Sequence, residues 1–222
     1  MMNESKFLSP ITGIFTATLL IANTLDTKIF ELGSLSLPAG IIIFPLAYVF
    51  GDILTEVYGF AASRRVIWTG FISLVLMLVA YEIARALPAA GFWQNQSAFD
   101  TIFSHVPRIV LASIVAYLAG EFTNSVVVAK MKVAQQGKNM GLRFVMSTFA
   151  GQAIDTTVFV LVAFTGAMPT SALGEVILSA WAVKVGWEII ALPITLAVVG
   201  YVKKAEGVDV YDAHTSFSPF RL

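Results

Sequence analysis

Two acidic residues stand four positions apart inside an otherwise apolar stretch, FPLAYVFGDILTEVYGF at residues 44–60. If this stretch is helical, Asp52 and Glu56 lie on one face, with Tyr48 one turn earlier. In a membrane-spanning helix an ionised side chain costs about 2.5 to 3.5 kcal/mol on insertion scales, and such residues mark substrate or ion pathways. The surroundings of this stretch therefore decide whether its carboxylates are functional.

Two other stretches share a local pattern with this one: a glycine, then a carboxylate or amide, then another polar residue three positions later. The three copies are GDILT at 51–55, GEFTN at 120–124 and GQAID at 151–155. The glycine permits close backbone approach, and polar residues three apart form one stripe on a helix. Three such stripes facing inward would line a common cavity. The flanking residues align poorly, so an internal duplication is left open.

The composition indicates that these helices lie in a membrane. Of the 222 residues 57% are hydrophobic and 13% charged, and the mean hydropathy is +0.81, whereas a soluble domain carries about 25% charged residues. We expect a single integral membrane domain over residues 1–222, with room for six spans of about 20 residues each. The zero net charge gives no indication of a nucleic-acid partner, and the absence of cysteine excludes disulfides, thiol catalysis and cysteine metal ligands.

The predicted fold is all-α, a polytopic bundle of six transmembrane helices. The spans are expected near residues 7–25, 39–60, 66–87, 108–129, 144–166 and 173–202. Between the first two spans, Gly33, Pro38 and Gly40 predict a tight external connection. Further connections are expected as a short loop at 61–65, an aromatic and polar interfacial segment at 88–108, and a polar tail from 203 that lies over the membrane face.

The distribution of basic residues predicts the orientation. If six spans alternate, ten lysines and arginines fall on one side, and two, Lys28 and Arg108, fall on the other. This positive-inside bias predicts that both termini lie in the cytoplasm. The start of the chain lacks the pattern of a cleavable signal peptide, so the first apolar run is expected to be a span as well.

Acids outnumber bases at membrane depth. The acids are Asp52, Glu56, Glu82, Glu121, Asp155 and Glu188, and the bases are Arg85 and Lys184. A low dielectric cannot hold all six acids as ions, so some are expected to carry protons near neutral pH, which makes proton coupling available. Glu82 and Arg85, near a span end, are expected to form a structural ion pair. A cavity is expected to be lined by the deeper groups that match across the spans, although such groups also hold helices together. They are Asp52, Glu56, Glu121, Asp155 and Lys184.

Trp181 and Trp187 flank Lys184 and Glu188 in the middle of the last span. A flat heterocycle stacked on an aromatic ring and held at its edge by a carboxylate is one ligand that this grouping suits. Packing between helices explains the two indoles equally well. The chain has no metal-ligand spacing and no Walker A motif, so we expect no metal, no cofactor and no ATP hydrolysis by that route.

Taken together, the motifs resemble those of the queuosine precursor transporter family. The likeness covers nearly the whole chain and rests on ANTL at 22–25, FP at 44–45, DILTEVYG at 52–59, RR at 64–65, PR at 107–108, STFAGQAIDT at 147–156 and Lys184. The resemblance implies a six-helix protein of the bacterial inner membrane that imports 7-deazaguanine precursors of queuosine, such as 7-cyano-7-deazaguanine. The related bases 7-aminomethyl-7-deazaguanine and queuine stay open as substrates.

Such a base suits the polar residues of the spans. Its guanine-like edge presents adjacent N–H donors, which a carboxylate accepts as a pair, and its planar face suits an aromatic ring. We expect carboxylates at the edge or as proton carriers, amides as orienting groups, and Lys184 as the partner of a carboxylate or of the cyano or carbonyl end. The expected substrate-binding residues are Asn23, Tyr48, Asp52, Glu56, Glu121, Asn124, Gln152, Asp155, Trp181, Lys184 and Trp187.

Other functions stay open at this point. The chain could be the substrate-binding membrane subunit of an importer that needs a separate energy-coupling ATPase module. An intramembrane enzyme with paired carboxylates is a second alternative, against which no nucleophile with an adjacent base is found. A scaffold for other proteins is a third, and it would leave the buried charges without a purpose. The expected partners are a purine-like base and the lipid bilayer, with a homodimer as one option for the oligomeric state.

Overall fold

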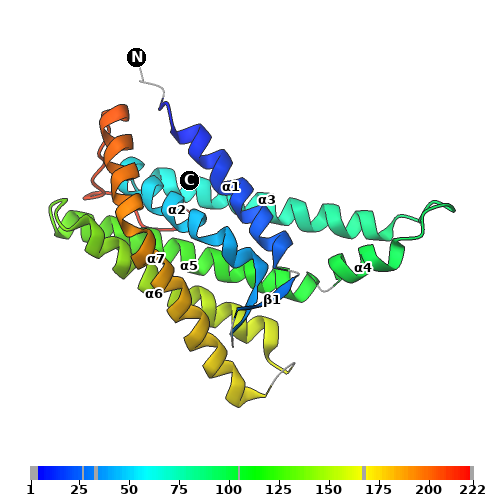
Figure 1. Cartoon of the computed structure of the whole chain (residues 1–222). Helices are drawn as coiled ribbons and strands as arrows, with labels where there is room; N and C mark the ends of the chain where they lie inside the picture. The colour runs from blue at the N-terminus through cyan, green and yellow to red at the C-terminus, as the bar shows by residue number, and fades with distance from the viewer. Residues whose placement is uncertain (1–4, 27, 33–34, 105, 167–168, 221–222) are drawn as a thin grey trace.

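The computed structural model is a bundle of long helices with a small hairpin at one side (Figure 1). It describes residues 5–26, 28–32, 35–104, 106–166 and 169–220, and the side chains of residues 29, 31–32, 35–38, 44–45, 104, 106–110 and 172 lie outside this description. In chain order the elements are α1 (Leu8–Leu25), β1 (Ile29–Leu32), β2 (Leu35–Pro38), the 3₁₀ helix η1 (Ala39–Ile42), α2 (Phe44–Tyr58), α3 (Phe60–Ala86), α4 (Gln96–Ser104), α5 (Val106–Ala134), α6 (Met140–Phe164) and α7 (Thr170–Glu206).

Five of these helices, α1, α3, α5, α6 and α7, are long and apolar enough to cross a membrane. The remaining predicted span consists of η1 and α2. With 15 residues, α2 is about 22 Å long, shorter than the hydrocarbon core of about 30 Å. The structure thus confirms a polytopic helical membrane protein, and a full crossing by the sixth span stays a prediction.

The prediction of a short loop at residues 61–65 is wrong, because a single residue, Gly59, turns the chain between α2 and α3. Gly59 lies between α2 and α3 with a φ of 80° and a ψ of 169°, a region that glycine adopts easily and other residues avoid. The N–H of Phe60, the first residue of α3, donates to Asp212 Oδ2 at 2.9 Å. Residues 61–65 therefore form the first turns of α3.

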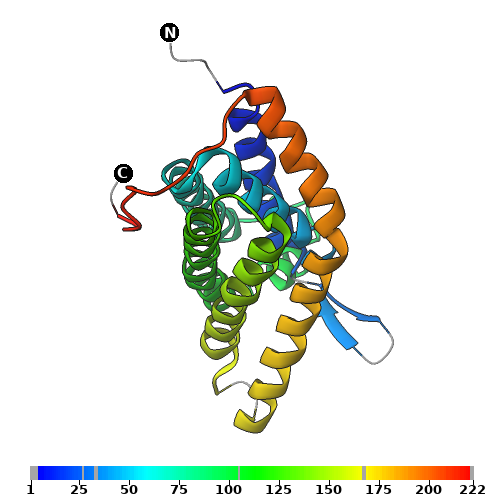
Figure 2. The ribbon, with the colours of Figure 1, turned by 90° about the vertical axis from the view of Figure 1, so that its left-hand side faces the viewer.

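The beginning of α1 and the end of α7 meet on one side of the bundle. Glu206 accepts hydrogen bonds from the N–H of Phe7 at 2.6 Å and from the hydroxyl of Tyr58, at the end of α2, at 2.7 Å. Figure 2 shows α1 and α7 side by side at this end. A chain that crosses the membrane an even number of times must begin and end on the same side, as the start of α1 and the end of α7 do here. That this side is cytoplasmic is the orientation predicted from the basic residues.

The segment between α1 and α2 forms an antiparallel hairpin, in which Ile29 pairs with Pro38 and Leu32 with Leu35. The hairpin takes the place of the simple tight connection that was expected. Within the described ranges it is the only β-sheet, so the all-α class holds for the membrane-embedded part of the chain.

The end of α3 agrees with the sequence analysis. The predicted ion pair between Glu82 and Arg85 is confirmed, with 2.9 Å between Arg85 Nη1 and Glu82 Oε1. Beyond it, the aromatic rings of the predicted interfacial segment contact one another around α4: the Phe99 centroid lies 4.6 Å from that of Phe103 and 6.0 Å from that of Trp93. Both features belong to the periphery of the bundle.

The tail after α7 runs across the ends of α2 and α3. The N–H of Val210 donates to the carbonyl oxygen of Val57 at 3.1 Å, and the indole N–H of Trp68 donates to the carbonyl oxygen of Pro219 at 2.8 Å. Residues 207–220 therefore cover the side of the bundle on which α1 begins.

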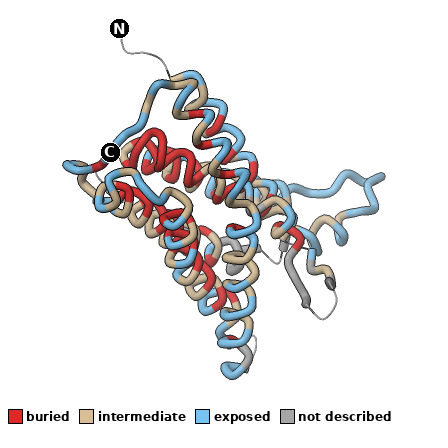
Figure 3. Tube along the Cα trace, turned by 60° about the vertical axis from the view of Figure 1, so that its left-hand side comes forward, coloured by how far each residue is buried: buried red, intermediate tan, exposed pale blue. Residues whose placement is uncertain are grey.

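Buried residues follow the inner faces of the helices, and exposed ones follow the outside (Figure 3). Many exposed residues are large and apolar: Ile72 and Leu76 of α3 are 62% and 68% exposed, and Ile190 and Ile194 of α7 are 71% and 67% exposed. A soluble monomer rarely presents so large an apolar surface, whereas in a bilayer it contacts acyl chains. The burial pattern is therefore that of a membrane domain.

Candidate functional site

The glycines of the repeated pattern lie where α5 contacts α2 on one side and α6 on the other. A Cβ on Gly120 would stand 3.1 Å from the carbonyl oxygen of Gly151, and a Cβ on Gly151 would stand 3.0 Å from that of Gly120. A Cβ on Gly51 would collide with the carboxylate of Glu121. Each glycine thus lets one copy of the pattern touch another, and the copy in α5 contacts those in α2 and α6. That the three stripes line a common cavity stays a prediction.

Asp52 lies at this meeting point. Its side chain is fully buried, and its Oδ1 accepts a hydrogen bond from Asn124 Nδ2 at 3.0 Å. Glu121 of α5 and Glu188 of α7 are close enough to interact electrostatically with it. Carboxyl groups from three helices therefore share one buried site.

Several oxygens of this site have no hydrogen-bond partner among the described residues. They are Asp52 Oδ2, Glu121 Oε1, Asn124 Oδ1, Gln152 Oε1 and Glu188 Oε1. Each of these side chains is at most 7% exposed. A buried polar atom without a partner costs about 1 to 3 kcal/mol, so proteins rarely tolerate a group of five. Such a group can accept the N–H donors of a ligand, and its carboxyl groups can hold protons. We call these five residues the acceptor cluster.

Asp155 and Lys184 form an ion pair beside the acceptor cluster. Lys184 Nζ lies 2.7 Å from Asp155 Oδ2 and 3.4 Å from Thr156 Oγ1. The expected partnership of Lys184 with a carboxylate is therefore present. Because Glu121 interacts electrostatically with Asp155, the ion pair and the acceptor cluster belong to one site.

Asp26, just beyond α1, adds a carboxylate that was not among the expected site residues. Its Oδ1 accepts the N–H of Gly40 at 3.1 Å, and its charge interacts with those of Lys184 and Asp155. Burial raises the pKa of Asp26 to about 6, against the smaller opposing effects of the Gly40 hydrogen bond and the Lys184 charge. The α1–β1 corner thus lies next to the ion pair, on the side opposite to the tail.

Tyr48 and Asn23 differ in how they relate to this site. Tyr48 is 5% exposed and lies within hydrogen-bonding reach of Gln152, so it lines the acceptor cluster. Asn23 Nδ2 donates to the carbonyl oxygen of Leu19 at 2.9 Å within its own helix. Within the described residues, the hydrogen bond of Asn23 thus stays inside α1 and does not join it to the cluster.

The two tryptophans lie apart from the acceptor cluster. The Trp181 indole N–H donates to the carbonyl oxygen of Phe149 at 3.1 Å, and its ring packs edge-on against that of Phe149 with centroids 4.6 Å apart. Trp187 is 44% exposed. The structure thus uses Trp181 to pack α7 on α6, and it does not bring Trp187 to the buried acids.

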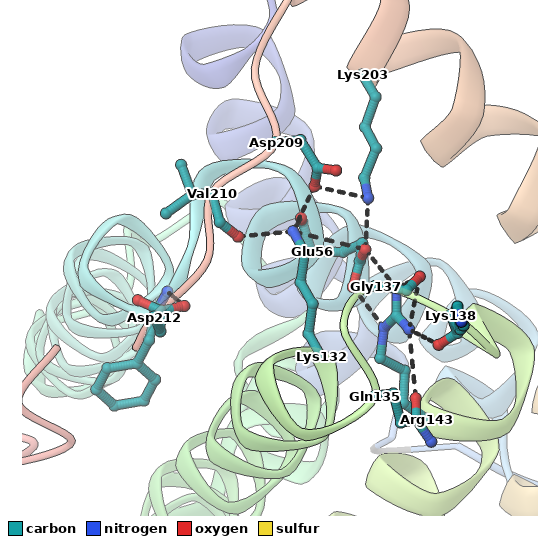
Figure 4. Close-up of polar contacts among 11 residues, drawn as sticks. Glu56, Lys132, Gln135, Gly137, Lys138, Arg143, Lys203, Asp209, Val210 and Asp212 are labelled. Carbon is teal, nitrogen blue, oxygen red and sulfur yellow. Dashed lines mark hydrogen bonds and ion pairs between the residues drawn. The ribbon is translucent and has the colours of Figure 1, made fainter. Parts of the chain in front are cut away.

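Glu56 belongs to a second cluster, shown in Figure 4. Its fully buried carboxylate accepts from Arg143 Nε at 2.7 Å and Nη2 at 2.6 Å, and from Lys203 Nζ at 2.5 Å. Lys132 Nζ lies 3.6 Å from it and also contacts Asp209. We call Glu56, Lys132, Arg143, Lys203 and Asp209 the Glu56 network. It joins α2, α5, α6, α7 and the tail on the side where α1 begins.

Asp209 lies outside the helices and completes the Glu56 network. Burial opposes its ionisation, but hydrogen bonds from Lys132 and Lys203 outweigh burial and hold the pKa of Asp209 below its usual value. Asp209 therefore stays ionised at neutral pH, and its ion pairs with Lys132 and Lys203 fasten the tail to the bundle.

Sequence reasoning missed the cations of this network, because Lys132 and Arg143 lie between two predicted spans and were counted only among the basic residues that set the orientation. Both are at most 1% exposed. Glu188 was recognised as a deep acid, but it was not included among the expected site residues. A usable signal existed for the network: the predicted topology brings the end of the second span, with Glu56, to the same membrane side as all three cations.

A sealed polar cluster within a bundle of apolar helices is the arrangement of a membrane transporter, which must hide a polar solute from lipid. Residues 38–198 match the model of the putative vitamin uptake transporter family, and the chain belongs to that family. It is accordingly a multi-pass transporter of the bacterial inner membrane and not an enzyme.

Two curated proteins are similar to the chain. One is a Bacillus subtilis (strain 168) protein named "probable queuosine precursor transporter", 28% identical over 177 residues that make up 79% of this chain and 77% of the relative. The other is an Escherichia coli (strain K12) protein named "queuosine precursor transporter", 28% identical over 125 residues that make up 56% of this chain and 54% of the relative. No solved structure matches the chain.

Proposed function

We propose that this protein imports 7-deazaguanine precursors of queuosine, with 7-cyano-7-deazaguanine as the first candidate. The names of its relatives give the substrate class. The observation that carries the proposal is the acceptor cluster, which offers buried oxygens without donors. A deazaguanine supplies the complementary group, because its N1–H and amino donors lie side by side on one edge.

The proposed roles follow from the contacts of each side chain. Asp52 and Glu121 accept the base edge, because each has a free oxygen and lies where the three stripes meet. Asn124 and Gln152 orient the base, and Tyr48 lines its face. Lys184 turns from Asp155 to an acceptor on the substrate, its carbonyl or cyano group. A stacking role for Trp181 or Trp187, and a hydrogen bond from Asn23, require the helices to rearrange when the substrate enters.

We assign Glu56 to a different task from the one expected from the sequence. Its oxygens are held by cations from three other helices, so it has little capacity left for a base. Opening the side of the bundle where α1 begins requires these ion pairs to separate. The Glu56 network therefore acts as the gate on that side, while the acceptor cluster binds the solute.

We further propose that transport is secondary and coupled to protons. Asp52 and Glu188 are buried acids from different helices that interact with each other, and two ionised carboxylates in such a site repel strongly. A proton on one of the two carboxyl groups removes this repulsion and lets the helices pack as closely as they do in this structure. Binding of a base to the other changes the affinity for that proton, which is the linkage that coupling requires.

Uptake of labelled 7-cyano-7-deazaguanine into cells that cannot synthesise it tests the substrate. We expect Asp52→Asn to reduce initial uptake at least about tenfold, which corresponds to about 1.4 kcal/mol. Glu82→Gln is the matched control, since Glu82 pairs with Arg85 at the periphery, and it should transport normally. Wild-type uptake by Asp52→Asn at equal expression would contradict the binding role.

Proteoliposomes that contain only this protein test the energy source. Uptake driven by an imposed pH gradient, and lost in Glu188→Gln, is expected for proton coupling. The alternative is a binding subunit that depends on a separate ATPase module. In that case the purified chain would bind the base but would not accumulate it under any gradient.

A further inference from the structure

A surface groove of about 700 Å³ runs between α1 and α3 and touches none of the residues of the acceptor cluster or the Glu56 network. Its α1 residues extend from Leu8 to Leu20, about 18 Å along the helix axis. On α3 it extends from Ala62 to Thr69. Both helices are apolar spans, so the groove opens to the hydrocarbon of the bilayer.

The groove lies at the depth of one leaflet. Both α1 and α3 begin on the side of the bundle where Glu206 and the tail lie, and the groove starts with the first residue of α1. Its length of about 18 Å compares with about 15 Å for one leaflet of the hydrocarbon core. With the orientation predicted from the basic residues, this is the cytoplasmic leaflet.

Two polar side chains that line the groove, those of Arg65 and Thr16, have few or no protein partners among the described residues. Arg65 is exposed, and the one hydrogen bond recorded for its guanidinium goes to the carbonyl oxygen of Ala61 at 3.4 Å. No described carboxylate lies within ion-pair distance of it. Thr16, deeper in the groove, has a buried hydroxyl without a hydrogen-bond partner among the described residues. The guanidinium at the membrane surface is thus left to an external ligand, and the hydroxyl below it can reach such a ligand once the Thr16 side chain rotates toward the groove.

We propose that this groove binds one anionic phospholipid of the cytoplasmic leaflet, with its phosphate at Arg65, an ester oxygen at Thr16 and an acyl chain along the groove toward Leu20. A guanidinium binds phosphate through two parallel hydrogen bonds. The Thr16 hydroxyl donates to the ester region, which lies directly below the phosphate in a bilayer. Ala17 and Leu20 line the deeper part of the groove, where the small side chain of Ala17 leaves room for the acyl chain.

Charge favours a lipid over a second copy of the protein in this groove. A two-fold dimer through the groove would place the same surface of two protomers face to face. No carboxylate lines the groove, so each Arg65 would meet a second cation and no anion. An anionic headgroup supplies the missing charge. The local attraction of a basic residue to an anionic membrane surface is worth about 1 kcal/mol.

Native mass spectrometry of the delipidated protein, titrated with phosphatidylglycerol or phosphatidylcholine, tests the charge requirement. We expect one saturable phosphatidylglycerol and weaker binding of phosphatidylcholine. Arg65→Gln should reduce the phosphatidylglycerol affinity about fivefold, which corresponds to about 1 kcal/mol. Lys138→Gln, at an exposed cation of the same side outside the groove, should not change it. Equal loss in both variants, or equal binding of both lipids by the wild type, would overturn the proposal.

A second variant pair tests the groove itself. A Cβ on Gly13 would meet no atom within 4 Å, so Gly13→Leu adds a bulky side chain from an open position of the groove lining and should abolish the saturable phosphatidylglycerol binding. Gly200→Leu, at an equally open position on α7, should retain it. A dimer that Gly13→Leu dissociates would mean that the groove is a protein interface. Displacement of the lipid by soluble glycerol 3-phosphate would mean a site for free phosphate esters. Either result would refute the lipid assignment.

Discussion

Replacing the acid of the Glu56 network should destabilise the protein more than replacing its arginine. Glu56→Gln removes the negative charge that three buried or half-buried cations share, and it leaves only Asp209 to oppose them. Arg143→Gln leaves the Glu56 carboxylate in contact with Lys203 at 2.5 Å and with Lys132 at 3.6 Å. The two substitutions therefore remove the same ion pair with different consequences.

The magnitudes follow from what each variant leaves unpaired. Removing one partner of a buried ion pair costs about 3 to 5 kcal/mol, and Glu56→Gln should lie near the upper end because the carboxylate is fully buried. Arg143→Gln should cost about 2 kcal/mol, the value of its charged hydrogen bonds, since two lysines still neutralise Glu56. In a chain of this size about 1 kcal/mol shifts Tm by about 2 to 4 °C. The expected losses are about 10 to 20 °C and about 4 to 8 °C.

Thermal unfolding in a mild detergent measures both losses. Glu82→Gln is the control, because it breaks a partly exposed pair and should lower Tm by less than about 4 °C. The double variant of Glu56 and Arg143 should lose less than the sum of the single variants, since each single change leaves the other charge without its partner. The role of Glu56 as the anion shared by the three cations is refuted if Arg143→Gln destabilises as much as Glu56→Gln, or if the two losses add.

Three other outcomes are expected from the site and its surroundings. Lys184→Gln should lower the initial rate of 7-cyano-7-deazaguanine uptake at least about tenfold, because it leaves the buried carboxylate of Asp155 without its cation; a normal rate in the cell uptake assay would exclude this. Gly120→Val should cost about 1 to 3 kcal/mol of stability by overpacking, seen as a lower Tm, whereas Gly200→Val should cost no stability, because a Cβ there meets no atom within 4 Å and valine has a higher helix propensity than glycine. Burial raises the pKa of Asp26 from 3.8 to about 6, so its ionisation costs the folded state stability as the pH rises through this window, up to about 3 kcal/mol. Asp26→Asn should therefore raise Tm at about pH 8 and have no effect below about pH 4. A gain in Tm that does not depend on pH would contradict the raised pKa of Asp26.

The sequence was sufficient for the class of fold and for the contacts between the polar stripes. Hydropathy identified every long span, because the bilayer requires apolar runs of a fixed length. The glycine of each stripe located the contacts between helices, since no larger residue fits at Gly120 or Gly151. The ion pair between Glu82 and Arg85 followed from their spacing alone.

Long-range polar contacts could not be predicted in the same way. A basic residue near a helix end is usually solvated, and nothing local distinguishes Arg143, which is fully buried, from Lys138, which is exposed. The difference arises from the acid that tertiary packing brings to one of them. The turn at Gly59 was missed for a related reason: glycine permits a sharp reversal, but the bond from Phe60 to Asp212 that supports it comes from the tail.

The tail has a consequence for how the protein is made. Asp209 and Asp212 follow α7 in chain order, yet they bond to Lys132 at the end of α5 and to the start of α3. During synthesis the ribosome releases the earlier helices into the bilayer first. Until these two aspartates emerge, α3 lacks its N-terminal acceptor, and Lys132 lacks its nearest anion and has only Glu56 at 3.6 Å. The nascent bundle should therefore stay loose and protease-sensitive, and it should consolidate only after α7 has been inserted.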